Sequence, residues 1–244
     1  MNTNQFVQSV AQELALRKQQ AIDHYRKKHL PFDFFAQYGC AVEHALASLW
    51  QEFFGRGRLC LIAIGGFGRG EMYPFSDLDL AIAATDSLSE EEQQTVTQFV
   101  QGLWDMKLHP AIKVGSITEL CESAREDITS DTAFLEARFL CGSHKIADKL
   151  LQNISLQRDT AAFIEGKLLE MQQRHDKAQG SGALLEPNVK NCPGGLRDIH
   201  IMLWLTKAQD LEAEVHSLIG TNIITRVVAG ILLNRYQQLD KIRI

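Results

Sequence analysis

The sequence predicts a mixed α/β core that is preceded by helices and followed by an all-α region. Two observations support this prediction: apolar runs of strand length occur in the middle of the chain, and helical spacing of apolar residues dominates before and after them. The chain has 244 residues, of which 45% are hydrophobic, as in ordinary folded domains. We expect a helical segment at 1–57, an α/β domain at 58–141 and a helical domain at 142–244.

Two helices are expected before the core. Apolar residues at Phe6, Val10, Leu14, Ala21 and Tyr25 follow the spacing of an amphipathic helix. A second helix is predicted from about residue 35 to 54, and the glycines just beyond it end that helix.

A buried strand and a glycine-rich turn open the α/β core. The continuous apolar run 59–64 has the length of a buried strand, and the glycine-rich segment 65–70 follows it directly. A second strand is predicted over 77–83, where acidic and apolar residues alternate at the start. Because successive side chains of a strand point to opposite faces, Asp77 and Asp79 share one face.

A helix and a further strand complete the predicted core. Ser89 is followed three residues later by Glu92, which is typical of a capping box, and a helix is predicted from there to Met106. The segment 110–117 is the next predicted strand.

From about residue 118 onward, helical spacing dominates the sequence. Interruptions are expected near Gly142, at 180–182 and at 193–195. The last residues, 232–244, keep a helical pattern without a Gly, Pro or polar tail. We therefore expect the chain to be part of a longer polypeptide with a helical domain that continues.

Composition argues against several classes of protein. The formal net charge is −5, so we expect no nucleic-acid partner. The N-terminus lacks a secretory signal, and no run reaches the roughly 18 apolar residues that cross a bilayer, so we expect a cytoplasmic protein without a membrane partner. The cysteines are odd in number, lack zinc spacing and are expected to be reduced packing residues: Cys40, Cys60, Cys121, Cys141 and Cys192.

The connection between the first two strands carries the candidate chemistry. The pair Gly65 and Gly66 allows backbone amides to approach a phosphate closely. Asp77 and Asp79 can present carboxylates to the same pair of hard divalent cations. Each feature alone is more often a tight turn or a solvated strand edge. Their order and spacing together predict a metal-dependent nucleotidyl-transfer site.

Other glycine motifs are excluded by the residues present. A dinucleotide fingerprint requires Gly-x-Gly-x-x-Gly, but its last position is occupied by Glu71 or Tyr73 in the two possible alignments. The sequence also lacks the Gly-Lys-Ser or Gly-Lys-Thr of a P-loop and the Gly-x-Ser-x-Gly of a nucleophile elbow. A phosphate-binding site that uses none of these motifs remains possible for the glycine-rich segment 65–70.

Two stretches of the sequence together resemble a known family. The first is GGFGRGE at 65–71, followed by SDLDL at 76–80. It resembles the active-site signature of the polymerase-β-like nucleotidyltransferases, and particularly of the bacterial PII uridylyltransferase family. The second is LEPNVK at 185–190, followed by PGGLRDIH at 193–200. It is similar to the signature of the helical domain that follows the catalytic domain in that family and in the glutamine synthetase adenylyltransferases.

The resemblance implies a polymerase-β-like core at 58–141, in which Gly65 and Gly66 contact nucleotide phosphates and Asp77 and Asp79 hold two magnesium ions. It implies transfer of UMP from UTP to a tyrosine of a PII signalling protein in nitrogen sensing, with release of pyrophosphate. Full family members continue with a uridylyl-removing HD-type phosphohydrolase domain and glutamine-sensing domains. Neither is recognised in this sequence, so the remaining domains of a longer polypeptide are expected partners.

Residues that border the first signature have two interpretations. We expect Arg69 and Ser76 either to bind the nucleotide or to stabilise the turn. The fold class usually has a third carboxylate on a later strand, yet 110–116 contains no acid; Asp105 and Glu119 flank it. Lys113, within that segment, is a solvated side chain or a phosphate ligand.

The second signature also has two interpretations. Lys190, Arg197 and Asn188 are candidates to bind the triphosphate. The alternative is an ion pair between Arg197 and either Asp198 or Glu186 that fastens the helical domain. Rival functions are adenylyl transfer from ATP to glutamine synthetase or another protein, and a non-catalytic module that binds a nucleotide.

Overall fold

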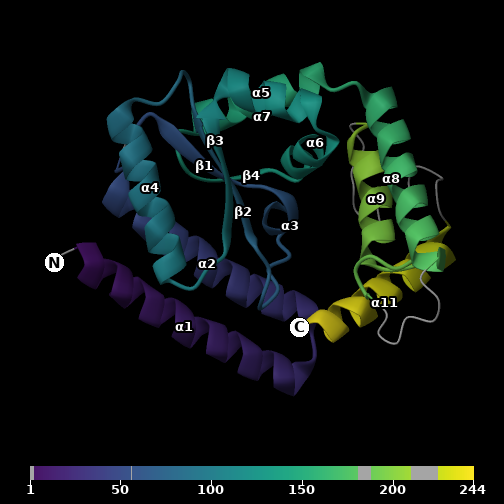
Figure 1. Ribbon diagram of the computed structural model, residues 1–244. Coiled ribbons are helices and arrows are strands. Elements are labelled where there is room, and N and C mark those ends of the chain that lie inside the picture. The colour runs from purple at the N-terminus through teal and green to yellow at the C-terminus, as the bar shows by residue number, and fades with distance from the viewer. Residues whose placement is uncertain (1–2, 56, 181–187, 210–224) are drawn as a thin grey trace. The chain divides into compact units, whose positions relative to one another are not determined.

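A computed structural model (Figure 1) describes residues 3–55, 57–180, 188–209 and 225–244. The chain divides into two compact units, Met1–Gln157 and Arg158–Ile244. Within the described residues, no helix is both long enough and apolar enough to cross a bilayer.

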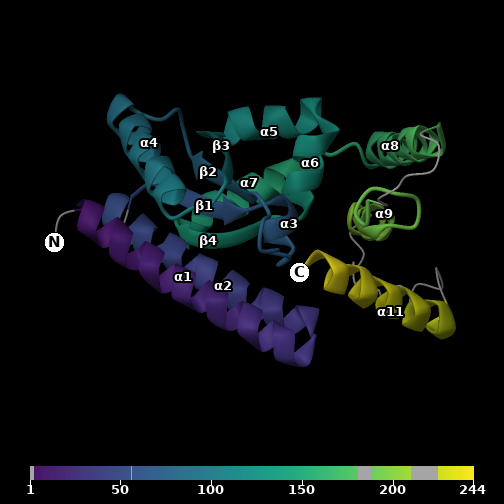
Figure 2. The ribbon, with the colours of Figure 1, turned by 60° about the horizontal axis from the view of Figure 1, so that its bottom comes forward.

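Two long helices begin the first unit and confirm the two predicted N-terminal helices. Helix α1 spans Thr3–Lys28, and α2 spans Pro31–Phe53. Helix α2 begins earlier than predicted because Pro31 occupies its first turn, where the missing N–H of proline costs nothing. One face of α2 is almost entirely buried, including Phe34 and Phe35. The two helices therefore pack as a pair (Figure 2).

The core of the first unit is a four-stranded mixed sheet, which confirms the predicted mixed α/β class. Its strands are β1 (Leu59–Ala63), β2 (Leu78–Ala84), β3 (Pro110–Ser116) and β4 (Arg138–Gly142), in the order β3-β2-β1-β4. Strand β1 runs antiparallel to β2 and β4, and β2 runs parallel to β3. All five residues of β1 are buried, as the continuous apolar run predicted.

Strand β4 corrects the prediction that the chain is helical after residue 118. Four of its five residues are only half-buried, and Gly142 is exposed. Its sequence, RFLCG, does not alternate between polar and apolar residues, so it carries no period-two signal. The strand is held by pairing with β1, with a register shift between Leu61 and Ile62. This long-range pairing could not be read from local pattern.

Helices cover the sheet on both sides (Figure 2). On one side, Cys60, Ile62, Ala81 and Ala83 pack against helices α5 (Ile117–Glu126), α6 (Ile128–Leu135) and α7 (His144–Gln157). On the other side, α2 packs with α4 (Glu90–Asp105), and the rings of Trp50 and Phe99 meet at 5.8 Å. Because side chains alternate along a strand, Asp79 shares the face of Ala81 and Ala83, which is the face covered by α5, α6 and α7.

Two helices of the first unit begin at capping boxes. At α4, Ser89 N donates to Glu92 Oε2 at 2.8 Å and Glu92 N donates to Ser89 Oγ at 3.3 Å, which confirms the predicted box. A second box that was not predicted starts α5, where Ser116 N donates to Glu119 Oε2 at 2.8 Å. Each box satisfies backbone donors that the first turn leaves unpaired.

The described elements of the second unit are the helices α8 (Thr160–Gly180), α9 (Leu196–Lys207) and α11 (Arg226–Arg243). Ile199 and Leu203 of α9 pack against Ala229 of α11. The segments 181–187 and 210–224 lie outside the described residues, so the all-α nature of this region stays a prediction. Leu185, Glu186 and Pro187 of the second signature fall in the first of these segments.

Candidate functional site

The first signature forms a sharp turn from strand to helix. Strand β1 ends at Ala63, and the short helix α3 (Gly65–Gly68) begins two residues later. Gly68 N donates to Ile64 O at 2.8 Å, and Glu71 N donates to Gly66 O at 2.9 Å. Gly65 and Gly66 therefore occupy the first two positions of a helical turn, where backbone N–H groups have no partner within the helix.

Gly65 lies directly against the side chain of Asp79. Its φ is +54°, a conformation that favours glycine. A Cβ at this position would lie 2.7 Å from Asp79 Oδ2, which is too close for any other residue without a shift. The backbones are joined as well, because Ile64 N donates to Asp79 O at 3.1 Å. The first glycine and the second acid of the signature thus form one structural unit.

The two acids of the signature differ in exposure. Asp77 is exposed and lies one residue before β2, which begins at Leu78 rather than at Asp77. Asp79 is the second residue of β2 and is half-buried. Because Asp77 lies outside β2, a shared face for the two carboxylates stays a prediction. Whether these carboxylates bind a metal stays a prediction, and the described residues contain no group of three or more potential ligands.

The structure gives no support for the two flanking acids as a third carboxylate. Ala111 is the partner of Asp79 in the parallel pairing of β2 with β3. Asp105 accepts a hydrogen bond from Gln101 Nε2 at 3.0 Å. Glu119 is held in the capping box of α5, where hydrogen bonds from the backbone and side chain of Ser116 lower its pKa. Both acids therefore have local structural roles.

Lys113 of β3 was the other candidate ligand. It is half-buried and lies beside Ala81 in the pairing of β2 with β3. Its position is thus two residues further along the sheet than that of Asp79. A contact between Lys113 and a phosphate stays a prediction.

Arg69 joins the signature to the rest of the core. Its Nη2 donates to Glu71 Oε2 at 2.8 Å, and its Nη1 lies 4.0 Å from Glu136 Oε2. The side chain of Arg69 is 17% exposed and those of Glu71 and Glu136 are 10% and 7% exposed. This cluster has the geometry expected if Arg69 stabilises the turn. A role in binding the nucleotide stays a prediction.

The N-terminal helices hold the loop that leads to the two acids. Ser76 is half-buried, and its N–H donates to Tyr73 O at 3.2 Å, which closes a turn. Lys18 Nζ of α1 donates to Pro74 O at 2.6 Å, and the rings of Tyr73 and Phe35 of α2 meet at 4.9 Å. These contacts leave no local signal in the sequence, because Lys18 and Pro74 are 56 residues apart.

The second signature forms a compact loop in the second unit. Asn188 Oδ1 accepts hydrogen bonds from the N–H groups of Lys190 at 3.0 Å and Asn191 at 2.9 Å. Arg197 N donates to Lys190 O at 2.9 Å. A Cβ at Gly195 would lie 2.7 Å from Val189 O, so this position requires glycine or a shifted loop. Asn188 therefore stabilises the turn, and its role in binding the triphosphate stays a prediction.

Asp198 fastens this loop to helix α8. Its carboxylate forms an ion pair with Arg174, accepts from Gly194 N at 2.7 Å and lies 3.1 Å from His175 Nε2. Burial alone would raise the pKa of Asp198, but the hydrogen bonds from Arg174, Gly194 and His175 outweigh it and lower the pKa. Arg174 was not among the predicted residues, because its partner Asp198 lies 24 residues away in the sequence.

Arg197, the predicted phosphate ligand beside Asp198, lies over an aromatic ring. Its guanidinium is 5.2 Å from the centre of the Trp204 ring, as in a cation–π contact. Glu186, the other partner suggested for Arg197, lies outside the described residues. The roles of Arg197 and Lys190 in nucleotide binding therefore stay predictions.

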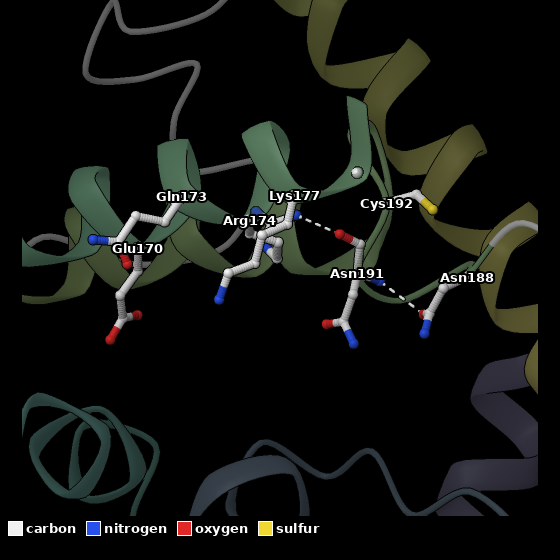
Figure 3. Close-up of a pocket in the computed structure, with 8 residues that line it drawn as sticks. Glu170, Gln173, Arg174, Lys177, Asn188, Asn191 and Cys192 are labelled. Atoms are coloured by element: carbon white, nitrogen blue, oxygen red, sulfur yellow. Dashed lines mark hydrogen bonds between the residues drawn. The ribbon is translucent and has the colours of Figure 1, made fainter. Parts of the chain in front are cut away.

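A shallow cavity of about 450 Å³ lies between this loop and α8 (Figure 3). Arg174 Nη1 bridges its two walls by donating to Asn191 O at 2.8 Å. Figure 3 shows the side chains of Glu170, Lys177 and Asn191 extending from the same side of the ribbon. The lining residues are Glu170, Gln173, Arg174, Lys177, Ala178, Asn188, Asn191 and Cys192.

The fold and the first signature define a mixed α/β protein with a glycine turn set against the carboxylate of Asp79. The family model "GlnD PII-uridylyltransferase" matches residues 162–244. A bifunctional uridylyltransferase/uridylyl-removing enzyme of Neisseria meningitidis is 55% identical over 221 residues, which cover 91% of this chain and 26% of that protein. A bifunctional uridylyltransferase/uridylyl-removing enzyme of Chromobacterium violaceum is 39% identical over 233 residues. These residues cover 96% of this chain and 27% of that protein. The chain belongs to the PII uridylyltransferase family.

The chain spans about a quarter of the length of the curated relatives that it matches. Two solved structures of a toxin–antitoxin pair also overlap 53% of this chain, with TM-scores of 0.33 and 0.32 and identities of 13% and 17%. A likeness this weak supports no statement about fold or function.

Proposed function

We propose that this chain transfers UMP from UTP to a tyrosine hydroxyl of a PII signalling protein and releases pyrophosphate. Membership of the PII uridylyltransferase family supports the transfer of a uridylyl group. The order of elements in the first unit, strand, glycine turn and Asp-x-Asp strand, is that of the polymerase-β-like core that the sequence resembles. The proposed site is the end of the sheet where β2 begins.

The contact between Gly65 and Asp79 carries this proposal. A bound triphosphate needs backbone donors, and the cations that accompany it need carboxylates. The structure sets the start of α3 and the carboxylate of Asp79 side by side, with no side chain between them. Asp77, exposed two residues earlier, can approach the same ligand. Donors for phosphate and ligands for a cation are thus available at one place.

The residues present fit magnesium as the cofactor. Asp77 and Asp79 offer hard oxygen ligands two residues apart, which suit a divalent cation such as magnesium. Two magnesium ions held there would neutralise charge on the entering and leaving oxygens.

The reaction would be an in-line displacement. The tyrosine oxygen attacks the α-phosphorus of UTP and its hydroxyl proton passes to solvent. A new P–O bond forms, and the bond to the bridging oxygen breaks to release pyrophosphate. The start of α3 holds phosphate oxygens, and the cluster of Arg69 with Glu71 and Glu136 keeps that turn in place. Catalysis by positioning of this kind needs no covalent enzyme intermediate.

For the second unit, we propose from the signature alone that Lys190 and Arg197 contribute to triphosphate binding. Arg197→Ala and Lys190→Ala should then raise KM for UTP. The fixed loop suits this role, because Arg197 N and Lys190 O are joined at 2.9 Å and the two residues are held near one another.

The test is incubation of the purified chain with a PII protein, magnesium and either UTP or ATP, followed by intact mass measurement of the acceptor. A gain of one UMP with UTP alone supports the proposal. A gain of one AMP with ATP would favour the adenylyl rival, with glutamine synthetase as the next acceptor to assay. Binding of UTP without transfer would favour a non-catalytic module. Asp77→Asn combined with Asp79→Asn should abolish transfer, and activity in that variant would exclude this site.

A further inference from the structure

Phe75 is the most exposed large apolar side chain among the described residues, at 92%. Its neighbours Met72 and Tyr73 are 2% and 5% exposed, and Leu78 is fully buried. A single exposed apolar residue is common on protein surfaces and indicates nothing by itself. Two further observations, on its backbone and on its position, distinguish Phe75.

The backbone that carries this ring is held in place. The turn is closed by the hydrogen bond from Ser76 N to Tyr73 O at 3.2 Å. Lys18 Nζ binds Pro74 O at 2.6 Å, and Tyr73 packs against Phe35 at 4.9 Å. Figure 1 shows this connection between α3 and β2 beside α2. The exposed ring therefore projects from a fixed turn, and binding to it needs little ordering of the loop.

The ring also lies beside the proposed site. Phe75 precedes Asp77 by two residues, so their Cα atoms are at most about 7 Å apart. A protein whose tyrosine approaches Asp77 must place other parts of its surface within reach of the ring. The ammonium of Lys18 lies 5.4 Å from the centre of the same ring and adds a positive charge.

A protein partner suits this arrangement better than a nucleobase. Small-molecule sites bury most of the ligand between walls. The ring of Phe75 instead protrudes, and Lys18 lies over its face. A protruding, fixed aromatic ring is the kind of anchor that fills an apolar pocket on another protein.

We propose that Phe75 is a docking anchor for the protein acceptor, its ring inserting among apolar side chains near the tyrosine that is modified. Lys18 faces a carboxylate or carbonyl oxygen at the rim of that apolar site. Phe75 thereby sets the affinity for the acceptor and leaves nucleotide binding and chemistry to the glycine turn and the acids. This inference rests on the proposed function, and it names a contact that selects the acceptor.

The experiment compares Phe75→Ala with two matched variants of the whole chain. Phe75→Tyr keeps the ring, and Phe32→Ala removes another phenylalanine that is 69% exposed, in the first turn of α2. Steady-state transfer is measured with the PII protein and UTP varied separately. Biolayer interferometry with immobilised chain measures binding of the PII protein directly, without any need for turnover.

We expect Phe75→Ala to raise KM for the PII protein and to weaken its binding by about tenfold, as for an interface anchor. Phe75→Tyr and Phe32→Ala should stay within about twofold of the wild type, as should KM for UTP in every variant. Unchanged KM for the PII protein would overturn the inference, and so would a rise in KM for UTP alone, which would indicate a nucleobase contact.

The two measurements separate this inference from the proposed function. If the wild-type chain binds the PII protein without modifying it, the proposed transfer fails. Weaker binding by Phe75→Ala would still support the anchor in that case. If the wild-type chain does not bind the PII protein, the anchor is excluded.

Discussion

The carboxylate of Asp79 occupies the place where a side chain at Gly65 would begin. A Cβ there would lie 2.7 Å from Asp79 Oδ2, and the φ of Gly65 is +54°. Alanine at this position therefore meets both a strained backbone and a displaced carboxylate. The glycine thus fixes how closely the start of α3 can approach the acid that is proposed to hold the cation.

Gly65→Ala should lower uridylyl transfer by about 100-fold, because a displacement of about 1 Å in a reacting group can cost that much. It should also destabilise the fold by about 1–2 kcal/mol through the left-handed conformation alone. Initial transfer rates and urea unfolding measure the two effects.

Gly70→Ala is the matched control for this substitution. Gly70 has a φ of +85°, yet a Cβ there would meet no atom within 4 Å. It should show a similar loss of stability with a much smaller loss of transfer. Equal losses of transfer in the two variants would show that backbone strain, rather than the contact with Asp79, explains the effect.

The fold of the core was predictable where local sequence pattern and structure coincide. The buried run 59–64, the glycine turn and the Ser89 capping box each carry a signal within a few residues. Strand β4 carries no such signal, because its half-buried residues neither alternate nor form a continuous apolar core segment. Its position depends on pairing with β1, which lies about 80 residues earlier in the sequence.

The candidate site was predictable as a set of residues but not as a set of contacts. Sequence pattern selected Gly65 and Asp79 without showing that they touch. It also missed the hydrogen bond from Lys18 to Pro74 and the ion pair of Arg174 with Asp198, both of which join separate elements. Such contacts form when distant parts of the chain pack together, and the local periodicity of a single sequence does not reveal them.

Arg138 should stabilise the first unit by joining three of its elements. From β4, its Nη2 donates to Glu43 Oε1 of α2 at 2.8 Å and to Phe67 O at 3.4 Å, and its Nε donates to Gly68 O at 3.4 Å. The carbonyls belong to α3, so this arginine binds its C-terminal end. Arg138→Met, which keeps an apolar stem, should lower the free energy of unfolding by about 1–2 kcal/mol.

Arg17→Met is the control for Arg138→Met, since Arg17 forms an ion pair within α1, with Glu13 at 2.6 Å on an exposed surface. It should cost about 0.3–0.5 kcal/mol, as for other helix pairs. Urea unfolding of both variants measures the difference. Equal costs would mean that the contacts of Arg138 with α2 and α3 contribute no more than a surface ion pair does.

Asp198 should make the free energy of unfolding of the second unit fall as the pH is lowered into the acid range. Its pKa is held below the ordinary value of 3.8, because the hydrogen bonds from Arg174, Gly194 and His175 outweigh the effect of burial. The folded state therefore takes up a proton less readily than the unfolded state. This contribution to stability is fully present above about pH 4 and is lost as the pH falls through the lowered pKa.

Asp198→Asn removes the titrating group and keeps an oxygen that can accept from Gly194. Urea unfolding between pH 2.5 and 7, pH values chosen to bracket about 3.8, should show a difference between wild type and variant that shrinks toward the acid end. Asp176→Asn is the control, because Asp176 is an exposed residue of α8 that accepts from Gln172 Nε2 at 2.9 Å. A difference for Asp198→Asn that stays constant with pH would show that the ion pair with Arg174 does not set the acid stability of this unit.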